Sequence, residues 1–454
     1  IATKQLYPDL GFSYQNKQVS EILENICIFH DLGKYTTFFQ DYLLTHKKVE
    51  QDLKKHSRIG AYCIANKYFN IDFTMALLSY YCIVNHHGNL KKIKDTEFFY
   101  DTAKDSYEKR FNKQKDDLIE KIDQIQKELD IHDINQFLYF IDYQHFRRAI
   151  KKKQKNKPNI QDYFFINYLF SLLTEADKLD ASETPVYTKQ QLDEQAVDKF
   201  IKPKSISELP SLAEIRKQNS LRNFARAEVL EQLNNTEILN YKLFTLTAPT
   251  GIGKTLTSLD FSLKLKAKIR KEENREAQII YGLPFINIIE QALDVYKNQV
   301  FKKDVSDGKV NILGHYQYAD IFGDTNNETS GYQQKMMQLD TWQSDIVITS
   351  FVQLFETLIS NRNKLLKNFH HFAGSIIILD EVQTLKLDLM PLIGASLYYL
   401  AKFLDARIIM MTATQPKIFD LAQQLILEEE GEKAETHELL HNHNKIFKKF
   451  ERSR

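Results

Sequence analysis

The sequence predicts a helical domain followed by an α/β domain with a mostly parallel sheet. In the first half, apolar residues recur every three or four positions, as they do in helices with one buried face. In the second half, short apolar runs alternate with helical stretches, which is typical of strands buried on both faces of a parallel sheet. We therefore expect a helical domain over residues 1–184, a linker over 185–210 and an α/β domain over 211–454.

The helical half shows no convincing strand pattern, because none of its apolar residues alternate strictly with polar ones. The first helix has Val19, Ile22 and Ile26 on one face and runs into His30. Four segments have the spacing of amphipathic or fully buried helices: 19–30, 73–84, 118–129 and 168–176.

A proline-containing stretch separates the two halves. Pro185, Pro203 and Pro210 lie among scattered charges without a clear period, which favours a linker. Beyond it, each predicted strand is short and apolar without alternation. The five predicted strands are Leu243–Thr247, Ile279–Leu283, Asp345–Thr349, Ile376–Leu379 and Arg407–Thr412.

Composition limits the class of protein. The chain has 454 residues, of which 43% are apolar and 27% charged, an ordinary composition for a folded protein. Its net charge of +1 means that any nucleic-acid contact must depend on local patches. No apolar run approaches the roughly 18 residues that span a bilayer, and the first residues lack a secretory signal. Since Cys27, Cys63 and Cys82 fit no disulfide framework, we expect a cytoplasmic protein without a membrane partner.

A phosphate-binding loop follows the first predicted strand. The segment Ala248–Thr255 has the P-loop pattern except that Ala replaces the first Gly, and a helical stretch comes next. Gly251 and Gly253 let backbone N–H groups close around phosphate oxygens. Lys254 would reach the β- and γ-phosphates, and the Thr255 hydroxyl would bind Mg²⁺. The predicted nucleotide-binding residues of the loop are Thr250, Gly251, Gly253, Lys254 and Thr255.

An acidic pair supports the same interpretation. Asp380 and Glu381 come directly after the apolar strand Ile376–Leu379. The Mg²⁺-holding Asp of a P-loop enzyme lies at the carboxyl end of a neighbouring parallel strand. We expect Asp380 to hold the Mg²⁺ that accompanies ATP, and Glu381 to orient or deprotonate the attacking water.

Asp380–Gln383 and Met411–Pro416 resemble motifs II and III of the superfamily 2 helicases. Residues 281–285 and 349–353 are similar to the segments of that family that grip the DNA backbone. The resemblance implies a first RecA-like lobe and a DNA-dependent ATPase and 3′–5′ helicase. This superfamily also needs a second RecA-like lobe, and only 38 residues (454 − 416) follow Pro416. We expect the sequence to be a fragment, or the second lobe to be missing or separately encoded. We expect the chain as given to bind ATP with little unwinding.

A second set of residues suits a divalent metal ion. The helical half contains the adjacent pair His30-Asp31, then His56, the adjacent pair His86-His87, and later Asp177. Imidazole and carboxylate ligands together suit Mn, Fe, Co, Ni or Zn, and Mg²⁺ is compatible with them. Asp177 lies four residues after Leu173 on a predicted apolar face, where a buried carboxylate needs a partner. Asp180, near the same face, is the alternative candidate for this ligand.

This set resembles the HD superfamily of metal phosphohydrolases. Joined to a superfamily 2 helicase lobe, it is similar to the helicase–nucleases of type I CRISPR interference. The resemblance implies one ion on Asp31, His56, His86 and His87, another on His30, Asp31 and Asp177, and Lys34 against a substrate phosphate. It further implies single-stranded DNA and a Cascade-type surveillance complex as partners. The family has one more His before His-Asp, which this sequence lacks upstream of His30. We therefore expect either that the natural chain begins earlier or that the first ion has one ligand fewer.

Three functions fit these features. The first is an ATP-dependent helicase–nuclease that degrades single-stranded DNA by metal-dependent hydrolysis. The second is an HD phosphohydrolase that acts on a nucleotide, with the P-loop domain as a regulatory ATP sensor. The third is a catalytically silent recruitment module. Cleavage assays on DNA and on nucleotides separate the first two.

Overall fold

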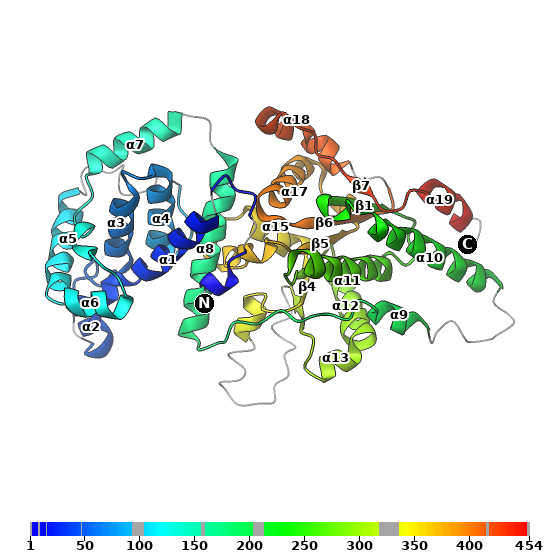
Figure 1. The fold of residues 1–454 in the computed structure, drawn as a ribbon, viewed down its shortest axis with the longest axis horizontal. Helices are drawn as coiled ribbons and strands as arrows, with labels where there is room; N and C mark the ends of the chain where they lie inside the picture. The colour runs from blue at the N-terminus through cyan, green and yellow to red at the C-terminus, as the bar shows by residue number, and fades with distance from the viewer. Residues whose placement is uncertain are drawn as a thin grey trace. The chain divides into compact units, whose positions relative to one another are not determined.

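The computed structural model divides into two compact units. The residues it describes are 2–7, 10–14, 16–46, 48–92, 104–155, 159–202, 213–316, 336–414 and 417–451. The first unit comprises Ile1–Pro8, Phe12–Asp180 and Ser360–His370, and the second comprises Asp9–Gly11, Ala181–Ile359 and His371–Arg454. In Figure 1 the long helical part of the first unit runs from blue to cyan, and the sheet of the second lies between green and red helices.

This division differs from the predicted domain boundaries. The units change at Asp180, four residues before the predicted end of the helical domain at residue 184. Residues 185–202 of the predicted linker belong to the second unit, where helix α9 (Ala196–Ile201) buries Val197 in the core. The remaining linker residues, 203–210, lie outside the described part of the chain.

The first unit is all-α over its described residues, as the sequence predicts. Its α-helices are α1 (Asn16–Phe29), α2 (Thr37–Leu44), α3 (Ser57–Tyr68), α4 (Phe73–Asn85), α5 (Lys104–Ile119), α6 (Ile122–Leu129), α7 (Tyr143–Lys155), α8 (Ile160–Ala181) and the short α16 (Asn363–Leu366). Helix α4 begins at a capping aspartate, because Asp72 accepts hydrogen bonds from the backbone of Thr74 and Met75. The prediction of one helix over 118–129 is wrong: residues 120 and 121 separate α5 from α6. Leu118 and Ile125 are nevertheless both buried.

Helices α1 and α3 approach so closely that no side chain fits between them at one point. A Cβ atom on Gly60 of α3 would lie 1.8 Å from the backbone oxygen of Phe29, the last residue of α1. A Cβ atom on Gly33 would likewise lie 2.3 Å from the backbone oxygen of His56. These two glycines bring the carboxyl end of α1 against the start of α3.

The segment Ser360–His370 joins the first unit although its neighbours in sequence belong to the second. Buried polar groups of α8 hold it. The Ser171 hydroxyl donates to the Lys367 carbonyl (2.9 Å) and accepts from the His370 backbone N–H (2.9 Å). Glu175 lies 3.0 Å from His370 Nε2. All four residues are nearly inaccessible to solvent, so these contacts anchor the segment rather than form a catalytic triad.

The second unit contains a seven-stranded sheet in the order β3-β4-β2-β5-β6-β1-β7. Every pair of neighbouring strands in it is parallel, which confirms the predicted α/β class. The strands are β1 (Leu243–Thr247), β2 (Ile279–Leu283), β3 (Ile312–His315), β4 (Ile346–Ser350), β5 (Ile376–Asp380), β6 (Arg407–Thr412) and β7 (His437–Glu438). Five match the predicted runs within a residue at each end. The strands β3 and β7 have no counterpart among the predicted runs.

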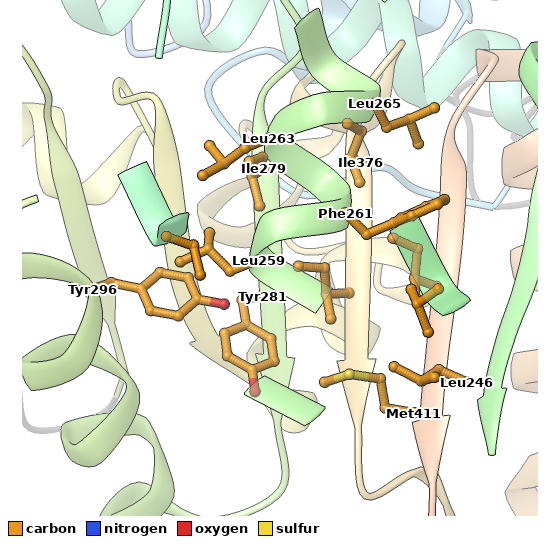
Figure 2. Packing of buried hydrophobic residues seen from close by; sticks show 14 of the residues in the cluster. Leu246, Leu259, Phe261, Leu263, Leu265, Ile279, Tyr281, Tyr296, Ile376 and Met411 are labelled. Atoms are coloured by element: carbon orange, nitrogen blue, oxygen red, sulfur yellow. The ribbon is translucent and has the colours of Figure 1, made fainter. Parts of the chain in front are cut away.

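Helices cover both faces of this sheet. Figure 2 shows Leu259 and Leu263 of α11 (Lys254–Glu273) against Ile279 and Tyr281 of β2. The next residue of β2, Gly282, faces the opposite side, where a Cβ atom would meet Leu354 of α15 (Phe351–Ile359). Alternate residues of a strand therefore bury against different helices, which is why these strands are apolar throughout.

The remaining α-helices of the second unit surround this core. They are α10 (Ala213–Glu231), α12 (Ile286–Leu293), α13 (Lys302–Ser306), α17 (Met390–Leu404), α18 (Ile418–Glu430) and α19 (His443–Glu451). The segment Leu387–Leu404, which includes α17, is the one helical stretch of the described chain long and apolar enough to cross a membrane. Half of it is buried inside the fold, as in the core helix of a globular domain.

We predict that Gly60→Ala destabilises the helical unit. The added methyl group has to displace the Phe29 backbone, and such overpacking costs about 1–3 kcal/mol. Urea unfolding followed by circular dichroism would show a lower midpoint. Gly88→Ala is the matched control, because the nearest atom to its Cβ would be 3.9 Å away. Equal midpoints for the two variants would contradict the close approach of α1 and α3.

Candidate metal centre and nucleotide-binding site

The carboxylate of Asp31 lies at the centre of the predicted metal site. It follows α1 and precedes a short 3₁₀ helix, Leu32–Tyr35. Its Oδ2 atom lies 3.1 Å from His30 Nε2 and 2.6 Å from Lys34 Nζ. Its Oδ1 atom lies 3.2 Å from His56 Nε2 and 3.9 Å from His86 Nε2. One carboxylate therefore contacts four side chains from three separate places in the chain.

Two of the histidines are oriented by backbone carbonyls. His30 Nδ1 lies 2.6 Å from the Cys27 oxygen, and His86 Nδ1 lies 2.6 Å from the Ile83 oxygen. A carbonyl oxygen only accepts, so each Nδ1 carries a proton, and in the neutral ring Nε2 offers its lone pair to the site. Metal-binding histidines are characteristically held in this way.

The other two histidines face each other. His56 precedes α3, and its Nε2 atom lies 2.8 Å from His87 Nε2. Ligand atoms of Asp31, His56, His86 and His87 all lie within 4.8 Å of one another. The structure thus brings together the four residues that were predicted to hold the first ion.

A second group shares the same aspartate. Ligand atoms of His30, Asp31 and Asp177 also lie within 4.8 Å of one another. Asp177, on α8, has its Oδ1 atom 4.0 Å from His30 Nε2. Its rival Asp180 belongs to neither of these groups and is exposed. The geometry favours Asp177 over Asp180.

The residues present fit a divalent cation. Among the described residues, Asp31 Oδ1 and His86 Nε2 are buried without a hydrogen-bond partner. His86 is 2% exposed, so water does not readily replace that partner. Unpaired lone pairs that converge on one point beside a carboxylate are the donors that a transition metal ion requires. Metal binding itself stays a prediction.

The electrostatics keep Asp31 charged and His86 neutral, the forms that bind a cation. Burial alone would raise the pKa of Asp31, but its interactions with His30, His56 and Lys34 lower it well below its usual range. Burial, together with the neighbouring His87, lowers the pKa of His86 to about 3. Burial would also lower the pKa of His30, yet the contact with Asp31 outweighs it and raises that pKa above 6.5.

A supporting residue escaped the sequence analysis. Asn363, in the segment Ser360–His370, donates from Nδ2 to the carbonyl of His86 (2.7 Å). Its backbone N–H donates to the Asn89 side chain (3.0 Å), and its Oδ1 accepts from Lys178 (3.1 Å). Asn363 therefore fixes the loop that carries the two adjacent histidines. Because Asn363 is far from that loop in the sequence, no local pattern indicated this contact.

The phosphate-binding loop lies in the second unit, between β1 and α11. Gly251 and Gly253 have φ values of 88° and 94°, which only glycine adopts without strain. Lys254 is 7% exposed, and its ammonium group lies 3.2 Å from the Ala248 carbonyl and 3.6 Å from Glu381 Oε1. Thr250 precedes Gly251 in the same turn. The exposed side chain of Arg222 on α10 donates to the Gly251 carbonyl (3.0 Å), a contact that the sequence did not indicate.

The acidic pair lies at the carboxyl end of β5, as predicted. Asp380 Oδ2 accepts a hydrogen bond from the buried Tyr281 hydroxyl (2.9 Å), which is also hydrogen-bonded to the Thr255 side chain. Burial raises the pKa of Asp380, although Tyr281 and the Lys254 charge partly oppose it. Tyr281 thus links the two residues predicted to hold Mg²⁺. The sequence analysis assigned it no such role.

A further contact connects the acidic turn with β6. Glu381 adopts a left-handed conformation at φ 56°, which turns the chain sharply after β5. Two residues on, Gln383 accepts a hydrogen bond from the Thr412 hydroxyl (2.6 Å) at the end of β6. The two helicase-like segments are therefore joined directly. Gln415 and Pro416, at the end of the second segment, lie outside the described residues.

Comparison with known proteins agrees with this architecture. Residues 228–421 match the DEAD/DEAH box helicase family. This part of the second unit is therefore similar to DEAD/DEAH box helicase domains. Over 263 residues, the chain is 25% identical to the CRISPR-associated nuclease/helicase Cas3 of Haloferax volcanii. The chain is therefore similar to this Cas3 protein over part of its length.

Solved structures show a similar fold. The T. fusca Cas3 structure with AMPPNP matches with a TM-score of 0.54 and 13% identity, over 96% of this chain and 50% of that one. The structure with ATP matches with a TM-score of 0.51 and 13% identity, over 93% and 47%. The chain thus spans about half the length of these structures. The Haloferax match covers 55% of this chain and 28% of that protein.

We predict that divalent-metal affinity falls as the pH drops from 8 to 6. The raised pKa of His30 means that protons compete for its Nε2 atom in this range, whereas His86 stays neutral. Isothermal titration with Mn²⁺ should show a loss approaching about tenfold per pH unit below that pKa. His132→Gln, at an exposed histidine outside the site, should leave the profile unchanged. An affinity independent of pH would contradict the assignment of His30 as a ligand.

We predict that Tyr281→Phe weakens binding of ATP in the presence of Mg²⁺. Loss of a hydrogen bond to a charged group costs about 1.5–3 kcal/mol, so Kd should rise at least tenfold. Tyr296→Phe is a closely matched control: its ring stacks on Tyr281 at 5.6 Å, and its buried hydroxyl has no hydrogen-bond partner among the described residues. Similar losses in both variants, measured with a fluorescent ATP analogue, would show that Tyr281 acts through packing alone.

Proposed function

We propose that this chain is an ATP-dependent helicase–nuclease that degrades single-stranded DNA in type I CRISPR interference. The observation that carries the proposal is the convergence of His30, Asp31, His56 and the two adjacent histidines in a chain that also holds a helicase domain. Likeness to Cas3 supports it. The first unit would be an HD nuclease domain, and the second a first RecA-like lobe.

In the nuclease, Asp31 would be shared between two ions. One would be held by His56, His86 and His87, and the other by His30 and Asp177. Mn, Fe, Co or Ni suits this donor set, and Mg²⁺ is compatible with it. Such ions, when bound, supply a nucleophilic water and stabilise charge on the phosphodiester.

Lys34 would act on the substrate directly. Its ammonium group is paired with Asp31 Oδ2 at 2.6 Å, and its side chain is 39% exposed. It can therefore turn from the carboxylate to a substrate phosphate. In this role Lys34 holds and neutralises the phosphate, while His30 and His86 keep their positions through the backbone contacts already described.

In the α/β unit, ATP with Mg²⁺ would occupy the loop of Thr250, Gly251, Gly253, Lys254 and Thr255. Asp380 would hold the Mg²⁺ through its water shell, and Glu381 would orient the attacking water. After the γ-phosphate of ATP leaves, the Lys254 ammonium group would pair with Glu381 Oε1, which lies 3.6 Å from it in this structure. We propose a cytoplasmic site of action and a Cascade-type surveillance complex as the partner that presents the strand.

A cleavage assay tests the nuclease. Incubated with Mn²⁺ or Ni²⁺ and circular single-stranded DNA, the wild-type chain should cut, and Asp31→Ala should lose at least about a thousandfold in rate, because both groups lose a ligand. Its ATP affinity should be unchanged, since the P-loop lies in the other unit. Asp177→Ala should be strongly impaired, whereas the exposed Asp180→Ala should cut normally.

The same assay separates the alternatives. Hydrolysis of free nucleotides without DNA cleavage would overturn the nuclease in favour of a nucleotide phosphohydrolase regulated by ATP. No hydrolysis of either substrate, together with ATP binding that Lys254→Ala leaves unaltered, would favour a silent recruitment module.

A further inference from the structure

A cavity of about 450 Å³ adjoins the candidate metal centre. His56 and His87 form part of its wall, so anything bound there lies beside the groups that surround Asp31. Its volume falls within the range of about 300–1,000 Å³ typical of small-molecule sites. The wall comes from three parts of the helical unit: α2, the residues leading into α3, and the end of α4 with the loop after it.

Aromatic rings line the side formed by α2. Tyr42 is 43% exposed, although a tyrosine ring buries readily against a core. Phe39 lies 6.5 Å from Tyr42 and 5.0 Å from His56, measured between ring centroids, and meets both edge to face. A continuous series of rings therefore leads from Tyr42 to the histidine cluster. Exposed rings of this kind are the surfaces on which unpaired bases stack.

The charge of the cavity is positive. Its wall contains Lys54, Lys55 and Lys91, and no acidic side chain is among its described lining residues. Lys55 is paired with Asp52 at 2.7 Å. Lys54 instead places its ammonium group 4.1 Å from the centroid of the Tyr42 ring. A lysine held at an aromatic face, rather than by a carboxylate, can turn to a phosphate without breaking an ion pair.

We infer that this cavity binds one unpaired nucleotide of a nucleic-acid strand, next to the phosphodiester held at the metal centre. The base stacks on Tyr42, and Lys54 and Lys91 contact the neighbouring phosphates. This inference rests on the proposed nuclease function and adds its substrate-positioning site. A paired base reaches such a cavity only after it leaves the helix stack, which costs a few kcal/mol, so the pocket selects single strands over duplexes.

A binding measurement tests the stacking without metal chemistry. The full chain is mixed, in EDTA and without ATP, with a pentanucleotide that carries 2-aminopurine, whose fluorescence falls on stacking. Wild type and Tyr42→Phe should quench the base, and Tyr42→Ala should bind about tenfold more weakly or quench less. Leu44→Ala is the matched control, because Leu44 lies on the same helix, is 69% exposed and does not line the cavity.

Cleavage kinetics with Mn²⁺ give an independent measurement. For wild type, replacement of the bases by abasic sites should lower kcat/KM about tenfold. For Tyr42→Ala, intact and abasic strands should be cut with equal kcat/KM, whereas Tyr42→Phe should retain the difference. This loss of discrimination identifies contact with the base, because general damage to the fold would slow both substrates alike.

The outcomes separate the inference from the function on which it rests. If wild type cleaves DNA but Tyr42→Ala keeps wild-type quenching and the full intact-to-abasic ratio, the nucleotide pocket is wrong and the nuclease stands. If wild type cleaves nothing, the proposed function fails, and the quenching in EDTA still decides whether the cavity takes a base. If 2-aminopurine in a blunt duplex were quenched equally, or if the chain hydrolysed dTMP and not the strand, the assignment of single-stranded nucleic acid as the ligand of the cavity would be wrong.

Discussion

The helical unit depends on one constraint: a partly buried carboxylate, Asp31, is surrounded by imidazoles and a lysine that all contact its two oxygens. Carboxylates are stable in such a place only when cations or hydrogen-bond donors compensate for the loss of water. The rest of the unit serves this arrangement. Gly60 lets α3 touch the end of α1, backbone carbonyls turn His30 and His86 inward, and Asn363 fixes the loop after α4.

The α/β unit also holds a buried carboxylate, that of Asp380, in position, but it uses different groups. Its sheet places the ends of β1 and β5 at one edge, with β6 between them. The buried hydroxyl of Tyr281 connects Asp380 with Thr255, so the acidic turn and the loop hold each other in position before any nucleotide arrives. Each site therefore depends on a neutral side chain, Asn363 or Tyr281, whose supporting contact the motifs did not indicate.

Features that form a local pattern could be predicted from the sequence, whereas contacts that only folding creates could not. Buried parallel strands are uninterrupted apolar runs, so β1, β2 and β5 were recognisable. The adjacent pairs His30-Asp31 and His86-His87 were recognisable as candidate metal ligands. The short strand β3 contains Gly314 and His315, and β7 consists of His437 and Glu438, so neither is such a run. Asn363 lies 277 positions from His86, and only folding brings the two together. The break between α5 and α6 shows that apolar spacing alone does not establish continuity.

The segment Ser360–His370 has a consequence for how this chain can be taken apart. It is covalently continuous with α15 on one side and leads to β5 on the other, yet its side chains complete the helical unit. A fragment ending at Asp180 would lose the amide that restrains the histidine loop and would expose Ser171 and Glu175 of α8 to solvent. The two compact units are thus interleaved along the sequence, so a single cut in the chain cannot separate one from the other intact.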